Sequence, residues 1–599
     1  MVLRLVKTLC LAWLGLIFGL RTAAALDVVV SVAGEQDALQ NELEAAALLN
    51  GLAEVETTTP QEILAAARAD YANLIGVLYS NGYYGGTISI RLDGREAAEL
   101  SSIAPPPSID RVDLRINPGP IFAFSEARIG PLAPGDAPPK GFALGKTARS
   151  DVIVDAAKQA VSGWRDQAHA KARVTGQSIT ADHRGSTLSA KVTIDPGPRL
   201  TFGELNITEN GNVRPERIRQ IADLPIGRPF SPDDLKTSSE RLRRTGAFNS
   251  VVLEEAEEVG QGNTLDVNAS LQAAKPRRIG FGAEIASLEG LSITAFWLHR
   301  NLFGGAERLR LDFEVGGIGG ESGGEDFLLS ARYERPATFS ADTDLFLSAL
   351  IEQDDEPEFR ERRAVVEGGL LHRFSEDLVG EIGLGYQLSD IDDALGSRTL
   401  TYLLFPARLT YDTREDELDP HQGYFADLEV TPLIGLDGDS DSGVRVFADL
   451  RSYLGFGESN GVVLAGRVQI GSVIGPGISA VPPGMLFFSG GAGTVRGQDF
   501  QELGVELPNG EQIGGRSFLG LSLELRTDVS TKWSLVSFVD AGFIGEDSFS
   551  AKSGDTHAGA GFGIRYNTGL GPIRFDVGTP LDDDAGSNFE IYVGIGQAF

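Results

Sequence analysis

Two hydrophobic periods divide this chain near residue 276. Before that point, apolar residues recur at helical spacing in segments such as 60–84 and are followed by short strands. From Arg277 onward, apolar and polar residues alternate with a period of two. In "RLRLDFEVGG" (308–317), one face carries Leu309, Leu311, Phe313 and Val315, and the other carries Arg310, Asp312 and Glu314. The pattern predicts an α+β first part and an all-β second part.

The first part contains a repeat. "INPGPIFAFSEARI" (116–129) matches "IDPGPRLTFGELNI" (194–207), and a looser copy starts at Leu271. In the third unit, Ser231 is a good N-cap, Pro232 fits the first helical position, and Gly246 ends the helix. A repeat of this length predicts three small α/β modules, at residues 26–117, 118–197 and 198–275.

Residues 276–599 are predicted to form about 16 strands, an even number as bacterial barrels require. The links between these strands alternate in length. The short links are 375–378, 456–460, 529–531 and 568–570, and the long links are 316–326, 352–363, 388–397, 435–443, 545–555 and 581–587. This alternation favours a 16-stranded transmembrane β-barrel whose short turns and preceding modules lie in the periplasm. A secreted β-sandwich is the alternative, but it gives no reason for the links to alternate.

The first residues have the pattern of a secretory signal peptide. Arg4 and Lys7 precede an apolar run at 9–20, and small residues at 23–25 suit cleavage, so residues 1–25 are predicted to be removed. The single cysteine, Cys10, would be lost with them. The net charge of -32 would become -35 without Arg4, Lys7 and Arg21, which excludes nucleic acid as a partner.

No motif in the chain indicates catalysis. There is no His-Glu-x-x-His, Cys pair, Gly-x-Ser-x-Gly or Walker loop. The acidic stretch 437–443 lacks the glycine and glutamate that a calcium loop needs at its sixth and twelfth positions, where Ser442 and Ala448 stand. We therefore expect no enzymatic activity and no catalytic, cofactor-binding or metal-binding residues.

Four motifs carry a resemblance to a known family. They are "WLHRNLFGGAERLRL" (297–311), "YDTREDELDPHQGY" (411–424), "TVRGQD" (494–499) and "FVDAG" (538–542). In this order, after periplasmic modules and inside a barrel, they resemble the BamA/TamA superfamily of outer-membrane assembly factors. The modules look like POTRA domains. Three of them resemble the TamA branch, since BamA-type proteins generally carry five and two-partner secretion transporters two.

The resemblance implies that residues 475–515 fold back into the barrel. Val495, Arg496 and Gly497 would form the tip motif of this loop, and Arg496 would pair with Asp540 on the inner wall. A buried cation needs such a pair, and a guanidinium matches a carboxylate bidentately. On the neighbouring strand, Glu524 and Arg526 could join the network. Gln498 stands where the family usually has an aromatic residue.

The last strand, "FEIYVGIGQAF" (589–599), is expected to place Phe589, Ile591, Val593, Ile595 and Phe599 on one face. A terminal Phe after alternating apolar residues resembles the recognition signal of outer-membrane barrels. Gly594 and Gly596 are expected to weaken this strand, either at a seam with the first strand (277–287) or by packing against the inserted loop.

The resemblance implies an assembly factor in the bacterial outer membrane, with its N-terminal domains in the periplasm. Its partners would be the lipid bilayer, unfolded outer-membrane proteins or autotransporters, and an inner-membrane-anchored TamB-like protein. A two-partner-type secretion transporter and a passive channel are the alternatives. Two modules and a plug helix would favour the transporter, and absence of modules would favour the channel.

Overall fold

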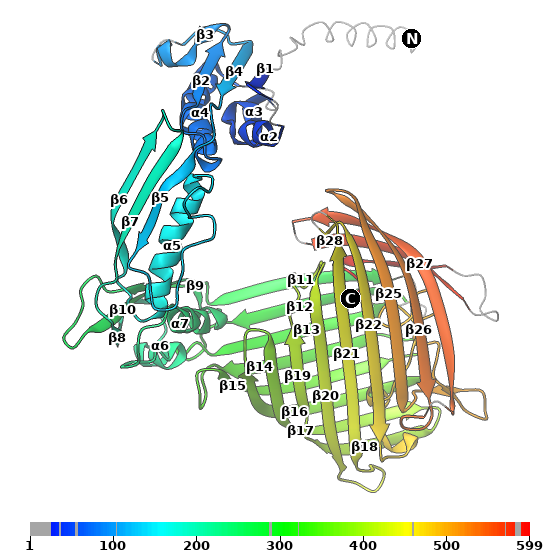
Figure 1. Cartoon of the computed structure of the whole chain (residues 1–599). Helices are drawn as coiled ribbons and strands as arrows, with labels where there is room; N and C mark the ends of the chain where they lie inside the picture. Colours follow the sequence, from blue (N-terminus) through cyan, green and yellow to red (C-terminus); the bar gives the residue numbers. More distant parts are fainter. Residues whose placement is uncertain are drawn as a thin grey trace, which may run out of the picture. The chain divides into compact units, whose positions relative to one another are not determined.

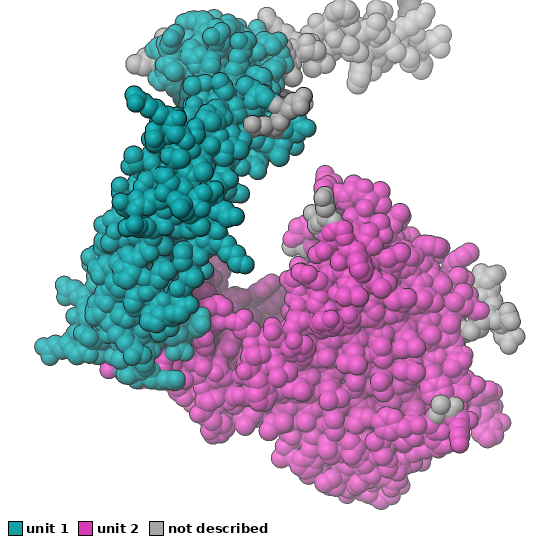
Figure 2. Space-filling model, viewed as in Figure 1, with its two compact units in different colours: residues 1–203, 226–234, 257–265 teal, residues 204–225, 235–256, 266–599 magenta. Residues whose placement is uncertain are grey.

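The structure is a computed structural model in which two compact units are distinguished (Figure 2). Unit 1 comprises residues 1–203, 226–234 and 257–265, and unit 2 comprises residues 204–225, 235–256 and 266–599. The described residues are 26–599 except 35–36, 54–57, 103–104, 287–289, 321–322, 458–459, 551, 570 and 582–588. The predicted signal peptide therefore lies outside the described residues. In the part that is described, none of the helices is long and apolar enough to cross a membrane.

The first module of unit 1 packs three helices on a four-stranded sheet of order β1-β4-β2-β3. Its elements are β1 (Asp27–Val32), α2 (Asp37–Ala46), α3 (Leu48–Ala53), α4 (Pro60–Ser80), β2 (Thr87–Leu92), β3 (Arg95–Glu96) and β4 (Arg111–Asn117). Helix α4 begins in a capping box, in which Thr59 accepts from the backbone of Glu62 and Glu62 accepts from the backbone of Thr59.

The second module is a three-stranded sheet of order β5-β7-β6 with one helix on its face (Figure 1). Its elements are β5 (Ala123–Gly130), α5 (Ser150–Asp166), β6 (Arg173–Asp182) and β7 (Thr187–Asp195). Ile153 and Ala156 of α5 are buried against Phe124 and Leu188 of the sheet. This packing of an amphipathic helix on a sheet supplies the core of the module.

The third module contains β8 (Thr201–Asn210), α6 (Pro215–Ala222), α7 (Pro232–Arg244), β9 (Phe248–Glu255) and β10 (Thr264–Ala273), with sheet order β8-β10-β9. Helix α7 starts at Pro232, and the backbone N–H of Asp234 donates to Ser231 Oγ (3.3 Å). The N-cap and first helical residue are those that the sequence predicts.

Most of the remaining described chain forms one large sheet (Figure 1). Its strands are β11 (Arg277–Ala286), β12 (Gly290–His299), β13 (Arg308–Ile318), β14 (Asp326–Arg335), β15 (Thr343–Asp355), β16 (Phe359–Arg373), β17 (Leu378–Asp393), β18 (Gly396–Leu404), β19 (Ala407–Asp412), β20 (Gly423–Gly435), β21 (Gly443–Phe456), β22 (Val462–Ile474), β25 (Ser517–Ser530), β26 (Trp533–Gly545), β27 (Gly554–Thr568), β28 (Gly571–Pro580) and β29 (Glu590–Ile595).

These seventeen described strands occupy sixteen positions in the sheet. β18 and β19 both pair with β17 on one side and with β20 on the other, so they are two parts of one strand. The interruption falls at Phe405 and Pro406, where proline has no N–H to give to the ladder. Sixteen positions are consistent with the predicted strand number.

The two faces of this wall are inverted relative to a water-soluble protein. Along β25, Leu521 and Leu523 are 44% and 48% exposed, whereas Glu524 and Arg526 on the opposite face are 0% and 4% exposed. A secreted sandwich would bury the leucines and expose the charges. An apolar outer surface around a polar interior is instead the arrangement of a barrel in lipid.

Two of the predicted long links are mostly strand, so that part of the prediction is wrong. In the stretch 352–363, β15 continues to Asp355 and β16 starts at Phe359, and in 388–397, β17 continues to Asp393 and β18 starts at Gly396. Polar side chains extend these hairpins. Asp393, for example, pairs with Arg398 across the turn (2.6 Å). The alternating apolar signal ends before the hydrogen-bonded ladder does, because these strand ends no longer carry an apolar face.

Candidate functional site inside the barrel

A long loop, residues 475–516, connects β22 to β25 and folds into the barrel. It contains a short hairpin of β23 (Val505–Glu506) and β24 (Gln512–Ile513). Its apolar residues Val481, Met485 and Phe487 pack in one buried cluster with Phe518 and Ile544 of the wall. The loop is therefore a packed part of the interior.

Arg496 lies at the centre of this loop and is 2% exposed. It donates from Nε and Nη2 to the two oxygens of Asp540 on β26 (2.8 and 3.0 Å), and its backbone N–H donates to the same carboxylate (3.1 Å). Nη1 donates to Glu524 on β25 (2.5 Å). The guanidinium also lies over the ring of Phe538, 3.7 Å from its centroid. The bidentate geometry suits a desolvated ion pair.

Two further arginines hold carboxylates that lie beside Arg496. Arg526 donates from Nε to Glu524 (2.9 Å). Arg565 on β27 donates from Nη1 to Asp576 on β28 (2.5 Å), and Asp576 lies 3.7 Å from Arg496. The network thus runs from the loop through two carboxylates to two further arginines.

The structure therefore brings together Arg496, Asp540, Glu524 and Arg526, as the sequence reasoning proposed. That reasoning did not include Arg565 and Asp576. The signal that could have found them is their alternation, since both occupy charged positions on the inner face of apolar strands.

Glycine is required beside Arg496 because backbones meet there. Gly497 has φ +94°, and a Cβ on it would lie 2.6 Å from the backbone of Thr579. A Cβ on Gly559 would lie 2.0 Å from the carbonyl oxygen of Arg496. The preceding residue, Val495, is fully buried. The Val-Arg-Gly tip therefore fits against the wall only while Gly497 and Gly559 carry no side chain.

Gln498 follows the Val-Arg-Gly tip of the loop. It is buried, and its Nε2 donates to the carbonyl of Ala558 on β27 (2.8 Å). The amide therefore ties this part of the loop to the wall by a hydrogen bond.

The end of the last strand differs from the expectation. Gly594 lies in β29, but Gly596 lies beyond it at φ +90°, and the chain turns there. Ile595 remains 65% exposed on the outer face, whereas Phe599 is 6% exposed and packs against Tyr453, Val463 and Ala465. The prediction that Phe599 shares the outer face is wrong, because the turn at Gly596 reverses the alternation.

The seam between the first and last strands has no ladder among the described residues. The sheet order begins at β11 and ends at β29, and the two strands lie next to each other. β29 pairs with β28 over only six residues, from Glu590 to Ile595. The tip loop also touches this strand, since the N–H of Gly497 donates to Tyr592 Oη (3.0 Å).

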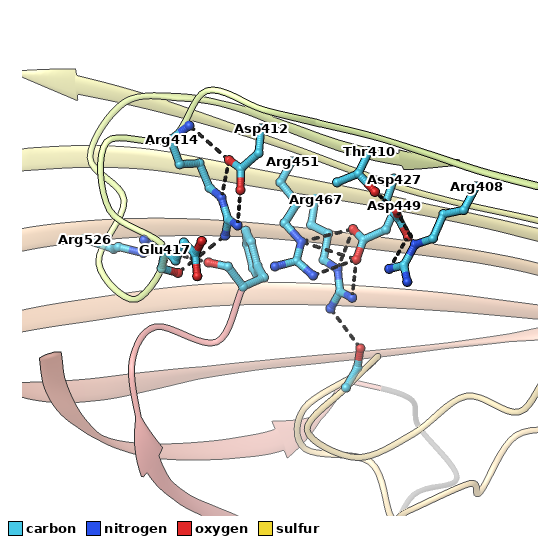
Figure 3. Close-up of polar contacts among 12 residues, drawn as sticks. Arg408, Thr410, Asp412, Arg414, Glu417, Asp427, Asp449, Arg451, Arg467 and Arg526 are labelled. Carbon is cyan, nitrogen blue, oxygen red and sulfur yellow. Dashed lines mark hydrogen bonds and ion pairs between the residues drawn. The ribbon is translucent and has the colours of Figure 1, made fainter. Parts of the chain in front are cut away.

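A row of ion pairs lines the inner face of the wall formed by strands β19 to β22 (Figure 3). Arg451 and Arg467 both donate to Asp449 (2.7 and 2.8 Å), and Arg408 donates to Asp427 (2.7 Å). Arg467 also donates to the carbonyl of Gly493 in the inserted loop (3.0 Å). The loop is thus held from this wall as well as from the Arg496 side.

Helices α6 and α7 contact the turn between β14 and β15. Arg241 and Arg244 both donate to Asp342 (2.6 and 2.9 Å). The hydrogen bond from Arg241 lowers the pKa of Asp342 to about 2 from its ordinary 3.8. Gln220 adds a hydrogen bond to the carbonyl of Ala337 (3.0 Å).

No cluster of three or more His, Cys, Asp or Glu with the geometry of a metal site occurs among the described residues. The arrangement is one of buried ion pairs that hold a loop in place.

Comparison with known proteins places this geometry in context. Residues 301–599 match the Omp85 superfamily domain, and residues 200–273 match the POTRA domain described as a surface antigen variable number repeat. The chain is 25% identical over 392 residues to outer membrane protein assembly factor BamA of Nitratidesulfovibrio vulgaris, covering 61% of this chain and 46% of that protein. It is 28% identical over 111 residues to BamA of Neisseria meningitidis, covering 18% and 14%. The chain spans less than half the length of these relatives.

Two solved structures share the fold. BamA from Haemophilus ducreyi lacking POTRA domains 1–3 superimposes with a TM-score of 0.62 at 18% identity, covering 79% of this chain and all of that one. CdiB from Acinetobacter baumannii gives a TM-score of 0.50 at 14% identity, covering 79% and 89%. Both likenesses, at these identities, concern the fold alone.

Proposed function

Because this chain belongs to the BamA/TamA-type Omp85 superfamily, which places its barrel in the outer membrane and its POTRA modules in the periplasm, we propose that it is a non-enzymatic assembly factor. It would receive unfolded β-barrel or autotransporter proteins from the periplasm and help to insert them into the bilayer. The name of its relatives, outer membrane protein assembly factor, supports this proposal.

The observation that carries the proposal is the seam. Strands β11 and β29 are neighbours without a ladder among the described residues, and β29 is short. Unpaired backbone groups are costly in lipid unless a partner strand satisfies them. An incoming strand that pairs at this seam would gain those hydrogen bonds, so the seam can serve as a template for insertion.

Three modules favour the TamA-like branch, and we propose an inner-membrane-anchored TamB-like protein as the partner of the periplasmic part. A secretion transporter or an open channel needs a path through the lumen. In this structure, the loop of residues 475–516 packs inside the barrel through the cluster around Phe487. That packing favours assembly at the seam over transport through the centre.

A disulfide across the seam tests the proposal. Cells depleted of the native protein would be complemented with a variant carrying cysteines at adjacent positions of β11 and β29. We expect the oxidised variant to fold but to leave outer-membrane proteins or autotransporters depleted in a quantitative proteome, and reduction to restore them. The control is Leu521→Cys with Ala541→Cys, which joins two strands that are already paired. Equal proteomes from the seam variant and the control would overturn the proposal.

A further inference from the structure

The turn between β19 and β20, residues 413–422, is stabilised by its own side chains. Glu415 accepts from the backbone N–H groups of His421 (2.6 Å) and Gln422 (3.1 Å). Asp416 accepts from the N–H groups of Leu418 (2.7 Å) and Asp419 (3.0 Å). Such local side-chain bonds give a turn a defined shape. The turn is therefore preformed and can present its backbone to a partner segment.

The base of this turn is anchored to the barrel wall (Figure 3). Arg414 donates from Nε and Nη2 to Asp412 (2.9 and 2.7 Å). Its guanidinium lies 4.6 Å from the centroid of the Phe425 ring. A paired and stacked arginine fixes where the turn leaves the wall.

The segment that the turn contacts is residues 596–599, which follow the last strand. The N–H of Gln597 donates to the carbonyl of Leu418 (2.8 Å), and its side-chain Nε2 donates to Asp419 Oδ1 (2.9 Å). A Cβ on Gly596 would lie 3.3 Å from the Leu418 side chain. The turn thus binds this segment through both backbone and side chain.

Two arginines of the interior hold the same segment from the other side. Arg565 Nε donates to Gln597 Oε1 (2.8 Å). Arg526 donates to the backbone oxygens of Phe599 (3.1 Å) and Pro420 (3.3 Å). Arg526 therefore joins residues 596–599 to the turn.

The same two arginines connect this segment to the inserted loop. Arg526 bonds Glu524, and Arg565 bonds Asp576, which are carboxylates beside Arg496. Polar contacts therefore run without a gap from Arg496 in the loop to the segment after β29.

We propose that the turn of residues 413–422 is a latch that binds residues 596–599 in the barrel interior and thereby fixes the end of β29. The latch is coupled to the loop of residues 475–516 through Arg526 and Arg565. While the latch is closed, β29 cannot leave the wall at this end. The latch itself follows from these contacts, and only its consequence for insertion rests on the function proposed above.

Hydrogen exchange of the purified full-length protein tests the latch without any substrate. In Asp419→Ala, the segment 596–599 should exchange about tenfold faster than in the wild type, because a hydrogen bond to a carboxylate is lost. The matched control is Glu417→Ala, which removes an exposed carboxylate from the same turn. Equal exchange in the two variants would overturn the latch.

Two further variants keep the proposal falsifiable. Gln597→Ala removes the same hydrogen bond from the other partner, so it should give the faster exchange even if Asp419→Ala fails to fold. For the coupling, Arg496→Met should speed exchange in residues 596–599 as well as in its own loop. Faster exchange confined to the loop would overturn the coupling. Because no substrate is present, these outcomes are independent of whether the seam assembles other proteins.

Discussion

Replacing Arg496 by methionine removes the cation from a site that keeps its anions. Asp540 and Glu524, which are 1% and 0% exposed, would lose their shared partner. Breaking a buried ion pair from one side costs about 3–5 kcal/mol. The lower end, about 3 kcal/mol, is expected here because water can reach the carboxylates once the loop leaves. That value corresponds to roughly a hundredfold shift of the loop from docked toward undocked.

Hydrogen exchange in residues 494–498 measures this equilibrium directly, because undocking exposes their backbone N–H groups. We expect Arg496→Met to exchange about a hundredfold faster there than the wild type. Heat-dependent migration on a gel should show that the barrel of this variant is still folded. The control is Arg408→Met, since the Arg408 side chain is 55% exposed and donates to Asp427 on the neighbouring strand. A pair this exposed should contribute less than about 1 kcal/mol.

A double-mutant cycle with Asp540→Asn measures the interaction energy between Arg496 and Asp540, apart from the effect of each single substitution. Residues in direct contact usually show a coupling of about 0.5–3 kcal/mol. Additive effects, or an unchanged rate of exchange in Arg496→Met, would refute the view that this ion pair holds the loop.

Two other predictions concern backbone fit and pH. Gly497→Ala should undock the loop, because the φ of +94° and the nearby backbone leave no room for a Cβ. A Cβ on Gly493 would meet no atom within 4 Å, so the control Gly493→Ala should behave as the wild type. Equal protease sensitivity of the two variants would contradict this prediction. The pKa of Asp342 is about 2 in the folded protein, against an ordinary value of 3.8. The contact between α7 and Asp342 should therefore be complete above about pH 4 and be lost as the pH falls toward 2. Exchange of α7 amides measured against pH checks this, and Asp342→Asn should remove that pH dependence.

The strand faces could be predicted from the sequence because alternation is a local property. Leu523 and Glu524 fall on opposite faces in any extended strand, and the even strand number with unequal links then favours a barrel. Arg496 stood out because it is a lone cation among glycines. The pairing with Asp540 came from resemblance to a family, since no local pattern says which wall residue a loop reaches.

The rest depends on contacts that alternation does not encode. The inward turn at Gly596 places Phe599 beside Tyr453, far away in sequence. Arg565 and Asp576 lie on consecutive paired strands, but they join the network only because the inserted loop brings Arg496 to within 3.7 Å of Asp576. The extended hairpins near Asp355 and Asp393 are built from polar residues, so their strand character is invisible to an apolar count.

The position of Arg496 in the chain has a consequence for the order of folding. Glu524, Asp540 and Asp576, the carboxylates around it, all belong to strands that follow the loop in the sequence. The cation therefore has its full set of counter-charges only once β28 has joined the sheet. A fully paired Arg496 therefore requires strands β25, β26 and β28 to stand together in the wall, so the seated loop reports that this part of the barrel is assembled.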